Sequence, residues 1–335
     1  MRHINIPLFI PHRGCPNQCV FCNQRTISGV SSYDPSVFRS VIEDTLATVN
    51  PTDEVEIAFF GGSFTGIERD EMVSLLELAY SYVRCGRVKS VRCSTRPDYI
   101  DGEILDILEK YGVTTIELGL QSISDRVLGI TRRGHGFSDE ERAAKMITER
   151  GISLVGQMMI GLPGSSLSDE ISTADFIIRA GASAARIYPT VVFHGTELCE
   201  MARHEEYTPL SIDEAVMRSA AVLRRFVEAG LPVIRIGLCS SENLLSDETY
   251  FAGPNHPALG ELVENRLYYD LICDAIKAAG LMNKEKINVE VAKGALSKAI
   301  GQKRRNKLLL TQTLAIGEIK FTESQDLSGY GVRVF

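Results

Sequence analysis

Short apolar runs alternate with longer stretches of helical period along the first 240 residues of the chain. The runs are rich in β-branched residues, whereas the stretches between them repeat apolar residues every three to four positions. Strands are expected at residues 4–10, 54–60, 90–94, 114–120, 153–160, 185–191 and, with a weaker pattern, 233–238. This alternation is typical of a parallel β/α domain, so we predict an α/β fold with a partial TIM-like (β/α)6 barrel.

Helix-start signals support this pattern. Asp34 precedes Pro35, which is the arrangement of a capping carboxylate before a proline at the first helical position. Ser138-x-x-Glu141 and Ser211-x-x-Glu214 have the spacing of a capping box. Each of the three signals predicts that a helix begins at that point.

The alternation stops at the turn-rich residues 251–257. Beyond them we expect a helix at about 258–279, a strand at 287–291, a second helix at about 295–310 and a strand at 318–322. We therefore predict two domains: a core domain over residues 1–250 and a small C-terminal α+β domain over residues 251–335.

Length and charge narrow the class of protein. The chain has 335 residues and a formal net charge of −7, and it has no apolar run of the ~18 to 20 residues that cross a bilayer. We expect a cytoplasmic protein without membrane contact, whose eight cysteines stay reduced. The acidic balance argues against a nucleic-acid-binding surface over the whole chain, while a local basic patch stays open.

Three cysteines carry the first chemical signal. Cys15, Cys19 and Cys22 follow the first expected strand with the spacing Cys-x-x-x-Cys-x-x-Cys. Three thiolates can hold three irons of a 4Fe–4S cluster and leave the fourth iron open to another ligand. The alternative is a tetrahedral zinc site, for which His12 would be the fourth ligand.

Polar and glycine-rich motifs follow the carboxyl ends of the later strands, where β/α barrels place their chemistry. They are Gly61-Gly62-Ser63-Phe64-Thr65, Ser94-Thr95-Arg96-Pro97-Asp98, Leu118-Gly119-Leu120-Gln121-Ser122, Arg132-Arg133-Gly134-His135 and Gly161-Leu162-Pro163-Gly164. Together with the cysteines, this ordered set resembles the radical S-adenosylmethionine (SAM) superfamily over roughly residues 5 to 240. Within it, the chain is similar to the elongator catalytic subunit and to the oxygen-independent coproporphyrinogen oxidases.

The resemblance implies a 4Fe–4S cluster on the three cysteines, with SAM bound to its open iron. It further implies roles toward SAM for residues at matching positions. These are Gly61, Gly62 and Ser63 for the methionyl amino group, Gln121 and Arg133 for the carboxylate with Arg132 as the alternative arginine, and Gly161, Leu162 and Pro163 near adenine. Phe21, directly before the third cysteine, is the aromatic residue expected to pack on the adenine.

The chain departs from its relatives in three respects. Its first two cysteines are closer together than in the elongator subunit. Ser94 stands where the relatives carry the glutamate expected to hold the ribose hydroxyls. After about residue 250 we see no room for the elongator acetyltransferase domain, so we do not expect acetyl-CoA-dependent tRNA modification.

We therefore predict a radical SAM enzyme that receives electrons from an external donor of the flavodoxin or ferredoxin type. The second substrate stays open between an RNA base and a porphyrin-like or other small metabolite. Arg186 and Tyr188, on the sixth expected strand, are the substrate-side candidates, and core packing is the alternative role for Tyr188.

A run of basic residues lies on one expected C-terminal helix: Lys298, Lys303, Arg304, Arg305 and Lys307. Such a run is usually a solvated helix face. The alternative is a docking patch for RNA or for an anionic metabolite. Outside the enzyme class, the competing interpretation is a zinc-stabilised nucleic-acid-binding module that uses this helix.

Overall fold

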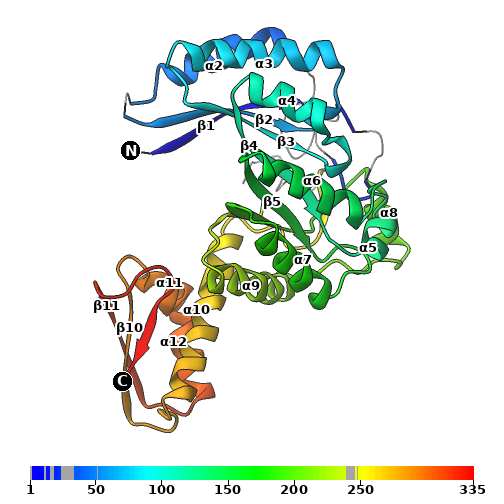
Figure 1. Cartoon of the computed structure of the whole chain (residues 1–335). Helices are drawn as coiled ribbons and strands as arrows, with labels where there is room; N and C mark the ends of the chain where they lie inside the picture. Colours follow the sequence, from blue (N-terminus) through cyan, green and yellow to red (C-terminus); the bar gives the residue numbers. More distant parts are fainter. Residues whose placement is uncertain are drawn as a thin grey trace.

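The structure is a computed structural model that describes residues 2–10, 13–15, 19–23, 34–50, 52–238, 246 and 248–335. Its main element is a curved sheet of seven strands in the order β1-β2-β3-β4-β5-β6-β8 (Figure 1). The strands are β1 His3–Ile10, β2 Glu54–Gly61, β3 Ser90–Thr95, β4 Val113–Gln121, β5 Ser153–Ile160, β6 Ala184–Pro189 and β8 Val233–Ile236. Neighbouring strands run parallel throughout this sheet. The predicted α/β half-barrel is confirmed.

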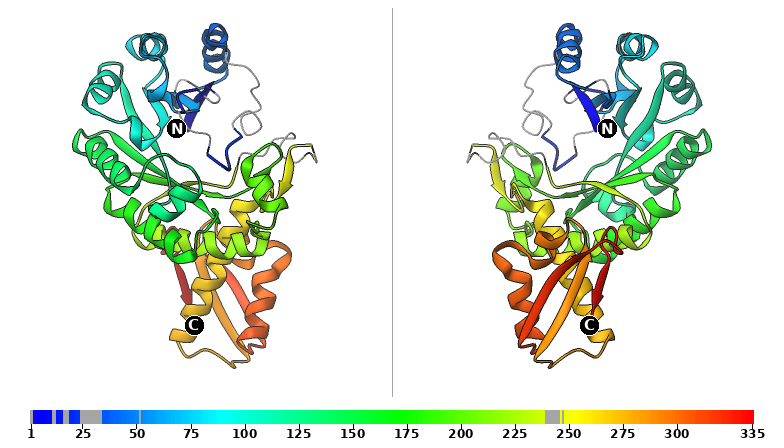
Figure 2. Two further views of the ribbon diagram at one scale, coloured as in Figure 1. Left: turned by 90° about the vertical axis from the view of Figure 1, so that its right-hand side faces the viewer. Right: turned by 90° about the vertical axis from the view of Figure 1, so that its left-hand side faces the viewer.

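Helices follow the strands and cover the outer side of the sheet, as Figure 2 shows from two sides. They are α2 Phe38–Leu46, α3 Arg69–Arg84, α4 Gly102–Lys110, α6 Phe137–Glu149, α7 Leu167–Arg179 and α9 Ile212–Glu228. Two short helices, α5 Asp125–Ile130 and α8 Glu197–Arg203, contribute no side chain to the core that the described residues form under these helices, and α8 packs against β7 and Val20 instead. None of the helices in the described ranges combines the length and the apolar character that crossing a bilayer requires.

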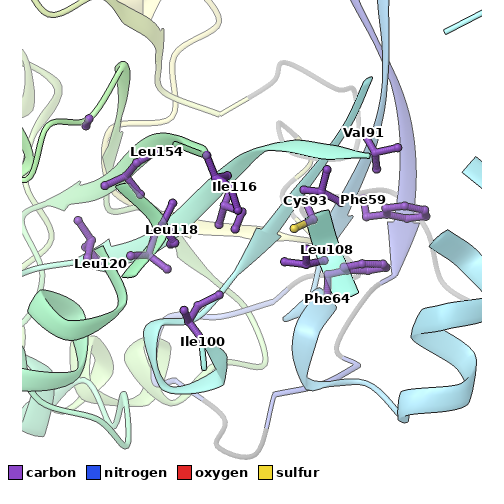
Figure 3. Close-up of a cluster of buried hydrophobic side chains, with 14 of the residues drawn as sticks. Phe59, Phe64, Val91, Cys93, Ile100, Leu108, Ile116, Leu118, Leu120 and Leu154 are labelled. Atoms are coloured by element: carbon purple, nitrogen blue, oxygen red, sulfur yellow. The ribbon is translucent and has the colours of Figure 1, made fainter. Parts of the chain in front are cut away.

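Apolar side chains fill the layer between the sheet and these helices. Alternate residues of each strand, such as Ile57, Phe59 and Ile116, face the helices and are fully buried. Figure 3 shows this layer, in which the rings of Phe59 and Phe64 stack at a centroid distance of 4.3 Å. Because the helix-facing positions alternate with the others, the remaining strand residues face the concave interior of the half-barrel.

The C-terminal unit has its own sheet and its own apolar core. Its strands are β10 Lys286–Ala292, β11 Glu318–Ser324 and β12 Val332–Val334, in the order β11-β10-β12. Helix α10, Leu259–Ala278, contributes Val263 and Leu267 to the large core and Ile272 and Ile276 to the small one. The helix therefore connects the two cores, and the division of the chain at residue 250 stays a prediction.

Local signals were correct at two of the three expected helix starts. The Asp34 side chain accepts a hydrogen bond from Ser36 N at 3.0 Å, and the 3-10 turn Pro35–Val37 leads into α2. The Ser211–Glu214 capping box forms at the start of α9. The predicted box at Ser138 is wrong, because α6 begins at Phe137 and Asp139 accepts the N–H of Gly136 instead.

The predicted helix over 295–310 is also wrong, since the structure has two helices there. Helix α11, Leu296–Ile300, ends before Gly301, and α12, Arg305–Thr313, begins after the 3-10 turn Gln302–Arg304. Gly301, Lys303 and Arg304 have φ values of 78°, 51° and 61°, which an α-helix cannot contain. The basic residues are therefore spread over two short helices and the turn between them.

Three short strands were missed. The predicted strand over 185–191 ends at Pro189, and β7, Val192–Phe193, instead pairs antiparallel with β9, Tyr250–Ala252. β9 lies partly in the segment expected to be only a turn. Strand β12 pairs antiparallel with β10. These strands are too short for an alternation pattern to stand out, and a partner distant in the sequence stabilises each.

Candidate active site

The cysteine loop lies between β1 and α2, at the carboxyl end of the sheet. Cys19 is buried, Cys22 is half-buried and Cys15 is exposed. The backbone of Val20 donates to Thr131 O at 3.2 Å and accepts from Leu198 N at 2.8 Å. The loop is thereby tied to the segment after α5 and to the start of α8. His12 lies outside the described residues.

Glycines allow the cysteine loop to pack directly on the turn after β2. A Cβ on Gly62 would lie 2.0 Å from Arg13 O, and a Cβ on Gly14 would lie 2.0 Å from Ser63 O. No side chain fits at either position, so both residues must be glycine for the two backbones to meet. Ser63 N completes the contact by donating to Arg13 O at 2.9 Å. The predicted roles of Gly61 and Gly62 toward SAM stay predictions beside this packing role.

The Ser63 side chain forms hydrogen bonds within the protein. Its Oγ lies 2.8 Å from Thr95 Oγ1 and accepts a hydrogen bond from Arg96 N at 3.2 Å. Ser63 is fully buried. Its hydroxyl therefore joins the turn after β2 to the end of β3, and the backbone of Ser63 is what faces the cysteine loop.

Two buried arginines approach the Cys19 sulfur. Arg133 Nη1 lies 3.4 Å and Arg96 Nη1 lies 3.9 Å from Cys19 Sγ. A guanidinium can donate a charge-assisted hydrogen bond to a sulfur at these distances. The family resemblance predicts a role toward the cofactor for Arg133, whereas the sequence indicates none for Arg96.

Arg96 is held by a network of its own. Its Nε and Nη2 donate to the two oxygens of Asp98, both at 2.9 Å, and Nη2 also meets Arg133 O and, at 3.2 Å, His135 Nδ1. Burial acts to raise the pKa of Asp98, but hydrogen bonds from His135 and Arg96 hold it well below its usual range. His135 Nε2 lies 3.4 Å from Glu140 Oε1, so a buried His–Glu pair closes the network. In the sequence, Arg96, Asp98 and His135 belong to polar motifs at strand ends, but their contacts with one another were not predicted.

Gln121 and Arg133, both predicted to contact SAM, lie close to each other in the structure. Gln121 ends β4 in a left-handed conformation with φ of 72°, and Arg133 Nη2 donates to the nearby Gly119 O. Within the described residues, Gln121 Oε1 and Arg133 Nε are buried without a hydrogen-bond partner. Gln121 Nε2 and Arg133 Nη2 both lie within 4 Å of a Cβ built on Gly119, so the two side chains are neighbours. One unpaired acceptor and one unpaired donor match the amino and carboxylate groups of an amino acid.

Arg132, the alternative arginine, lies elsewhere. Its side chain is 64% exposed and forms an ion pair with Glu197 at 2.6 Å. Arg132 is therefore a surface residue, whereas the adjacent Arg133 is buried.

The turn after β5 is braced from two sides. Gly161 N donates to Glu170 Oε1 at 2.6 Å, and Tyr207 Oη donates to Gly161 O at 2.7 Å. Leu162 and Pro163 are buried. The turn is thus positioned at the same edge of the sheet as the cysteine loop. Phe21, on that loop, is half-buried and packs against an apolar cluster that includes Val20 and Tyr207.

A charged network lines the concave interior below this edge. Arg92 donates to Glu56 at 2.7 and 3.0 Å and to Glu117 at 3.0 Å. Glu117 also accepts from Arg186 at 2.7 Å and from Gln157 at 2.7 Å. In the sequence, Glu56, Arg92 and Glu117 are visible only as charged residues at alternate positions of apolar strands, a pattern that does not by itself predict a network.

The two substrate-side candidates lie together in this interior. Arg186 Nη1 donates to Tyr188 Oη at 3.2 Å, and its guanidinium carbon lies 5.6 Å from the Phe60 ring centroid. Ser94 faces the same interior, beside Glu117 in the register of β3 and β4. In the part of the chain that the structure describes, no three His, Cys, Asp or Glu side chains converge as ligands of a single metal ion would.

Comparison with known proteins identifies relatives of the chain. It is 28% identical over 247 residues to the tRNA uridine(34) acetyltransferase of Methanocaldococcus infernus, which covers 60% of this chain and 46% of that protein. It is 26% identical over 262 residues to the Homo sapiens Elongator complex protein 3, with 64% and 48% covered. The chain thus spans about half the length of these curated relatives.

A solved structure has the same fold. The archaeal Methanocaldococcus infernus Elp3 superposes with a TM-score of 0.62 and 22% identity, covering 83% of this chain and 63% of that one. The profile of the Radical_SAM C-terminal domain matches residues 182–269. The profile of the Radical SAM superfamily matches residues 9–177, which include the three cysteines, the turn after β2 and the turn after β5. The chain is therefore an enzyme of the radical SAM superfamily, whose members bind a 4Fe–4S cluster and SAM.

Proposed function

We propose that this enzyme cleaves SAM reductively at a 4Fe–4S cluster bound by Cys15, Cys19 and Cys22. Held by these cysteines, the cluster would pass one electron from a flavodoxin- or ferredoxin-type donor to SAM, whose C5′–S bond would break to give methionine and a 5′-deoxyadenosyl radical for hydrogen abstraction from the second substrate. The observation that carries the proposal is the pair of buried atoms without a hydrogen-bond partner among the described residues, Gln121 Oε1 and Arg133 Nε, on two side chains of which Arg133 also contacts the Cys19 sulfur.

The chain's own residues would bind and orient SAM from several strands. Arg133 would hold the carboxylate through Nε, and Gln121 Oε1 would accept a hydrogen bond from the amino group. The backbone of Gly61 to Ser63, at the end of β2, would meet the methionyl amino group, and the braced turn at Gly161 to Pro163 would lie along the adenine. Ser94 retains a hydroxyl for the ribose where the relatives carry glutamate.

The half-barrel would also protect the radical. Its wall is continuous from β1 to β8, and the interior base is closed by the paired charges of Glu56, Arg92 and Glu117. These side chains have exposed fractions of 10% or less. Exclusion of water on this side limits side reactions of a reactive intermediate.

The test is anaerobic reconstitution of the full chain, followed by iron, sulfide and zinc analysis and by an assay for 5′-deoxyadenosine after addition of SAM and dithionite. We expect iron and sulfide in the wild type, and loss of the iron–sulfur absorption when any one of the three cysteines is replaced by Ala. His12→Ala is the matched control, which should keep the absorption. Zinc in place of iron, lost in His12→Ala, would support the zinc-stabilised module instead.

For the second substrate we favour an RNA base, because one relative of this chain is a tRNA uridine(34) acetyltransferase. The basic C-terminal residues support this class in part. Lys303 and Arg304 are exposed, whereas Lys298 is paired with Glu264 at 2.8 Å. A porphyrin-like or other small metabolite is the alternative, and the net charge of −7 favours it.

A salt series separates the two substrate classes. We expect wild-type protein to bind a tRNA anticodon stem-loop with an affinity that falls as salt rises, because binding releases counterions. Reversal of Lys303 and Arg304 to Glu should weaken binding most at low salt, whereas reversal of the exposed Arg142 and Lys145 on α6 should not. The absence of salt-dependent affinity in the wild type would favour the small metabolite.

A further inference from the structure

The charges inside the half-barrel do not balance. Two carboxylates, Glu56 and Glu117, face this interior together with the guanidinium groups of Arg92 and Arg186, and all four are joined by ion pairs. Arg235 adds a third guanidinium from β8. Among the described residues, no carboxylate forms an ion pair or hydrogen bond with Arg235. One positive charge in the interior therefore lacks a partner within the described residues.

The register of the sheet places this charge beside Arg186. Arg186 on β6 pairs with Arg235 on β8, and the next pair, Ile187 and Ile236, packs into the core under the helices. Paired residues of neighbouring parallel strands share a face, so the two arginines both face the interior, with strands about 4.8 Å apart. Like charges at neighbouring positions repel each other, and only Arg186 is neutralised, by Glu117.

Polar groups near Arg235 add hydrogen-bonding capacity. Nε of Arg186 is buried without a partner among the described residues, although the other two nitrogens of that group are bonded to Glu117 and Tyr188. Arg235 lies close enough to Tyr188 to act on its phenol, whose pKa burial raises against the opposing charges of Arg186 and Arg235. Arg235 is itself half-buried. A half-buried cation without a counterion is costly unless a ligand supplies the negative charge.

We propose that Arg235, with Tyr188 and the free Nε of Arg186, binds an oxyanion of the second substrate. This inference rests on the proposed function, since it names a charged group of the substrate that the radical would attack. The oxyanion is a phosphate if the substrate is a nucleotide and a carboxylate if it is a small metabolite. A guanidinium binds both groups through paired hydrogen bonds.

The experiment is calorimetric titration of the full, cluster-loaded chain at low salt with two anionic probes, uridine 5′-monophosphate and citrate. Uridine, which lacks the phosphate, is the neutral control. We expect at least one anionic probe to bind the wild type. Arg235→Gln should weaken that binding about 10- to 100-fold, the usual effect of losing one charged hydrogen-bonding group, and Arg235→Lys should weaken it less.

Arg225→Gln is the matched control variant, because Arg225 lies on the outer helix α9 and pairs with Asp175 at 2.8 Å. It should bind the probes as the wild type does. Circular dichroism and denaturant unfolding of Arg235→Gln would verify that the variant is folded. If Arg235→Gln weakens the binding of uridine 5′-monophosphate alone, the natural oxyanion is a phosphate. If the variant weakens the binding of citrate alone, the natural oxyanion is a carboxylate.

Two results would overturn the oxyanion subsite: failure of both anionic probes to bind the wild type, or equal affinity of wild type and Arg235→Gln. The same wild-type preparation is assayed for its cluster and for 5′-deoxyadenosine. If these are present while the titration fails, the subsite is wrong and the proposed function stands. If the cluster does not form, the proposed function is wrong.

Discussion

Arg133 contacts the Cys19 sulfur with one nitrogen and leaves another, Nε, buried without a partner among the described residues. We predict that Arg133→Gln weakens SAM binding about 10- to 100-fold, because a charged hydrogen bond contributes about 1.5 to 3 kcal/mol. Anaerobic titration of the reconstituted protein with SAM measures the effect. Arg132→Gln is the control and should bind SAM normally, because Arg132 pairs with Glu197 at the surface. A loss confined to Arg132→Gln would show that the other arginine holds the carboxylate.

Arg96 allows a second prediction at the residue scale. Hydrogen bonds and positive charge beside a cluster thiolate stabilise the reduced, more negative state and raise the reduction potential. Arg96→Gln should therefore lower the midpoint potential of the cluster, measured by a redox titration followed by electron paramagnetic resonance. Arg150→Gln, which removes an exposed arginine paired with Asp106 and Glu109, should leave the potential unchanged. Equal potentials in the two variants would exclude an effect of Arg96 on the cluster.

Among the helices of the C-terminal unit, one buried side chain stabilises the break between α11 and α12. Asn306 Nδ2 donates to Asn265 O at 2.7 Å and to Ala299 O at 3.1 Å, so it satisfies the end of α11 and joins it to α10. Asn306→Ala should lower the free energy of unfolding by about 1 to 3 kcal/mol, because buried carbonyls lose their donor.

Denaturant unfolding followed by circular dichroism measures this change. Gln302→Ala, at an exposed position of the same turn, should stay within about 0.5 kcal/mol of the wild type. Equal stability of the two variants would mean that the break does not depend on Asn306.

At the scale of the whole molecule, the buried His–Glu pair makes stability depend on pH. Burial raises the pKa of Glu140 to about 7 against the attraction of His135. Burial lowers the pKa of His135, but hydrogen bonds to Asp98 and Glu140 outweigh it and the pKa is raised. Both groups hold protons more tightly in the folded state than in the unfolded state. Their contribution is therefore present at low pH and is lost as pH rises through about 7.

We predict that the free energy of unfolding falls by roughly 1 to 3 kcal/mol between about pH 5.5 and pH 8. Glu140→Gln should remove most of this dependence, because an amide does not titrate. Guanidinium unfolding of both proteins at each pH checks the prediction. A slope that is the same in the variant would assign the pH dependence to other groups.

Local sequence was sufficient for the large elements and for the position of the cysteine loop. Each strand alternates between residues that pack under the helices and residues that face the concave interior. This pattern predicts the bounds of β5 to the residue. The Ser211–Glu214 box likewise needs only residues within one turn. Interactions of this range are encoded by neighbours in the chain, so a pattern can show them.

Tertiary structure decided which charges meet. Arg132 and Arg133 are adjacent and chemically alike, but a φ of 54° at Arg132 sends one to the surface and one to Cys19. The unpaired charge of Arg235 depends on which strand lies beside β6 and in what register. Such contacts join residues far apart in the chain. The interaction between them forms only after the order and register of the strands have brought the two side chains together. For that reason the sequence alone was enough for the class of chemistry, and the cysteine ligands stay its prediction. Arg235, the cation that we assign to the substrate's oxyanion, emerged only from the fold.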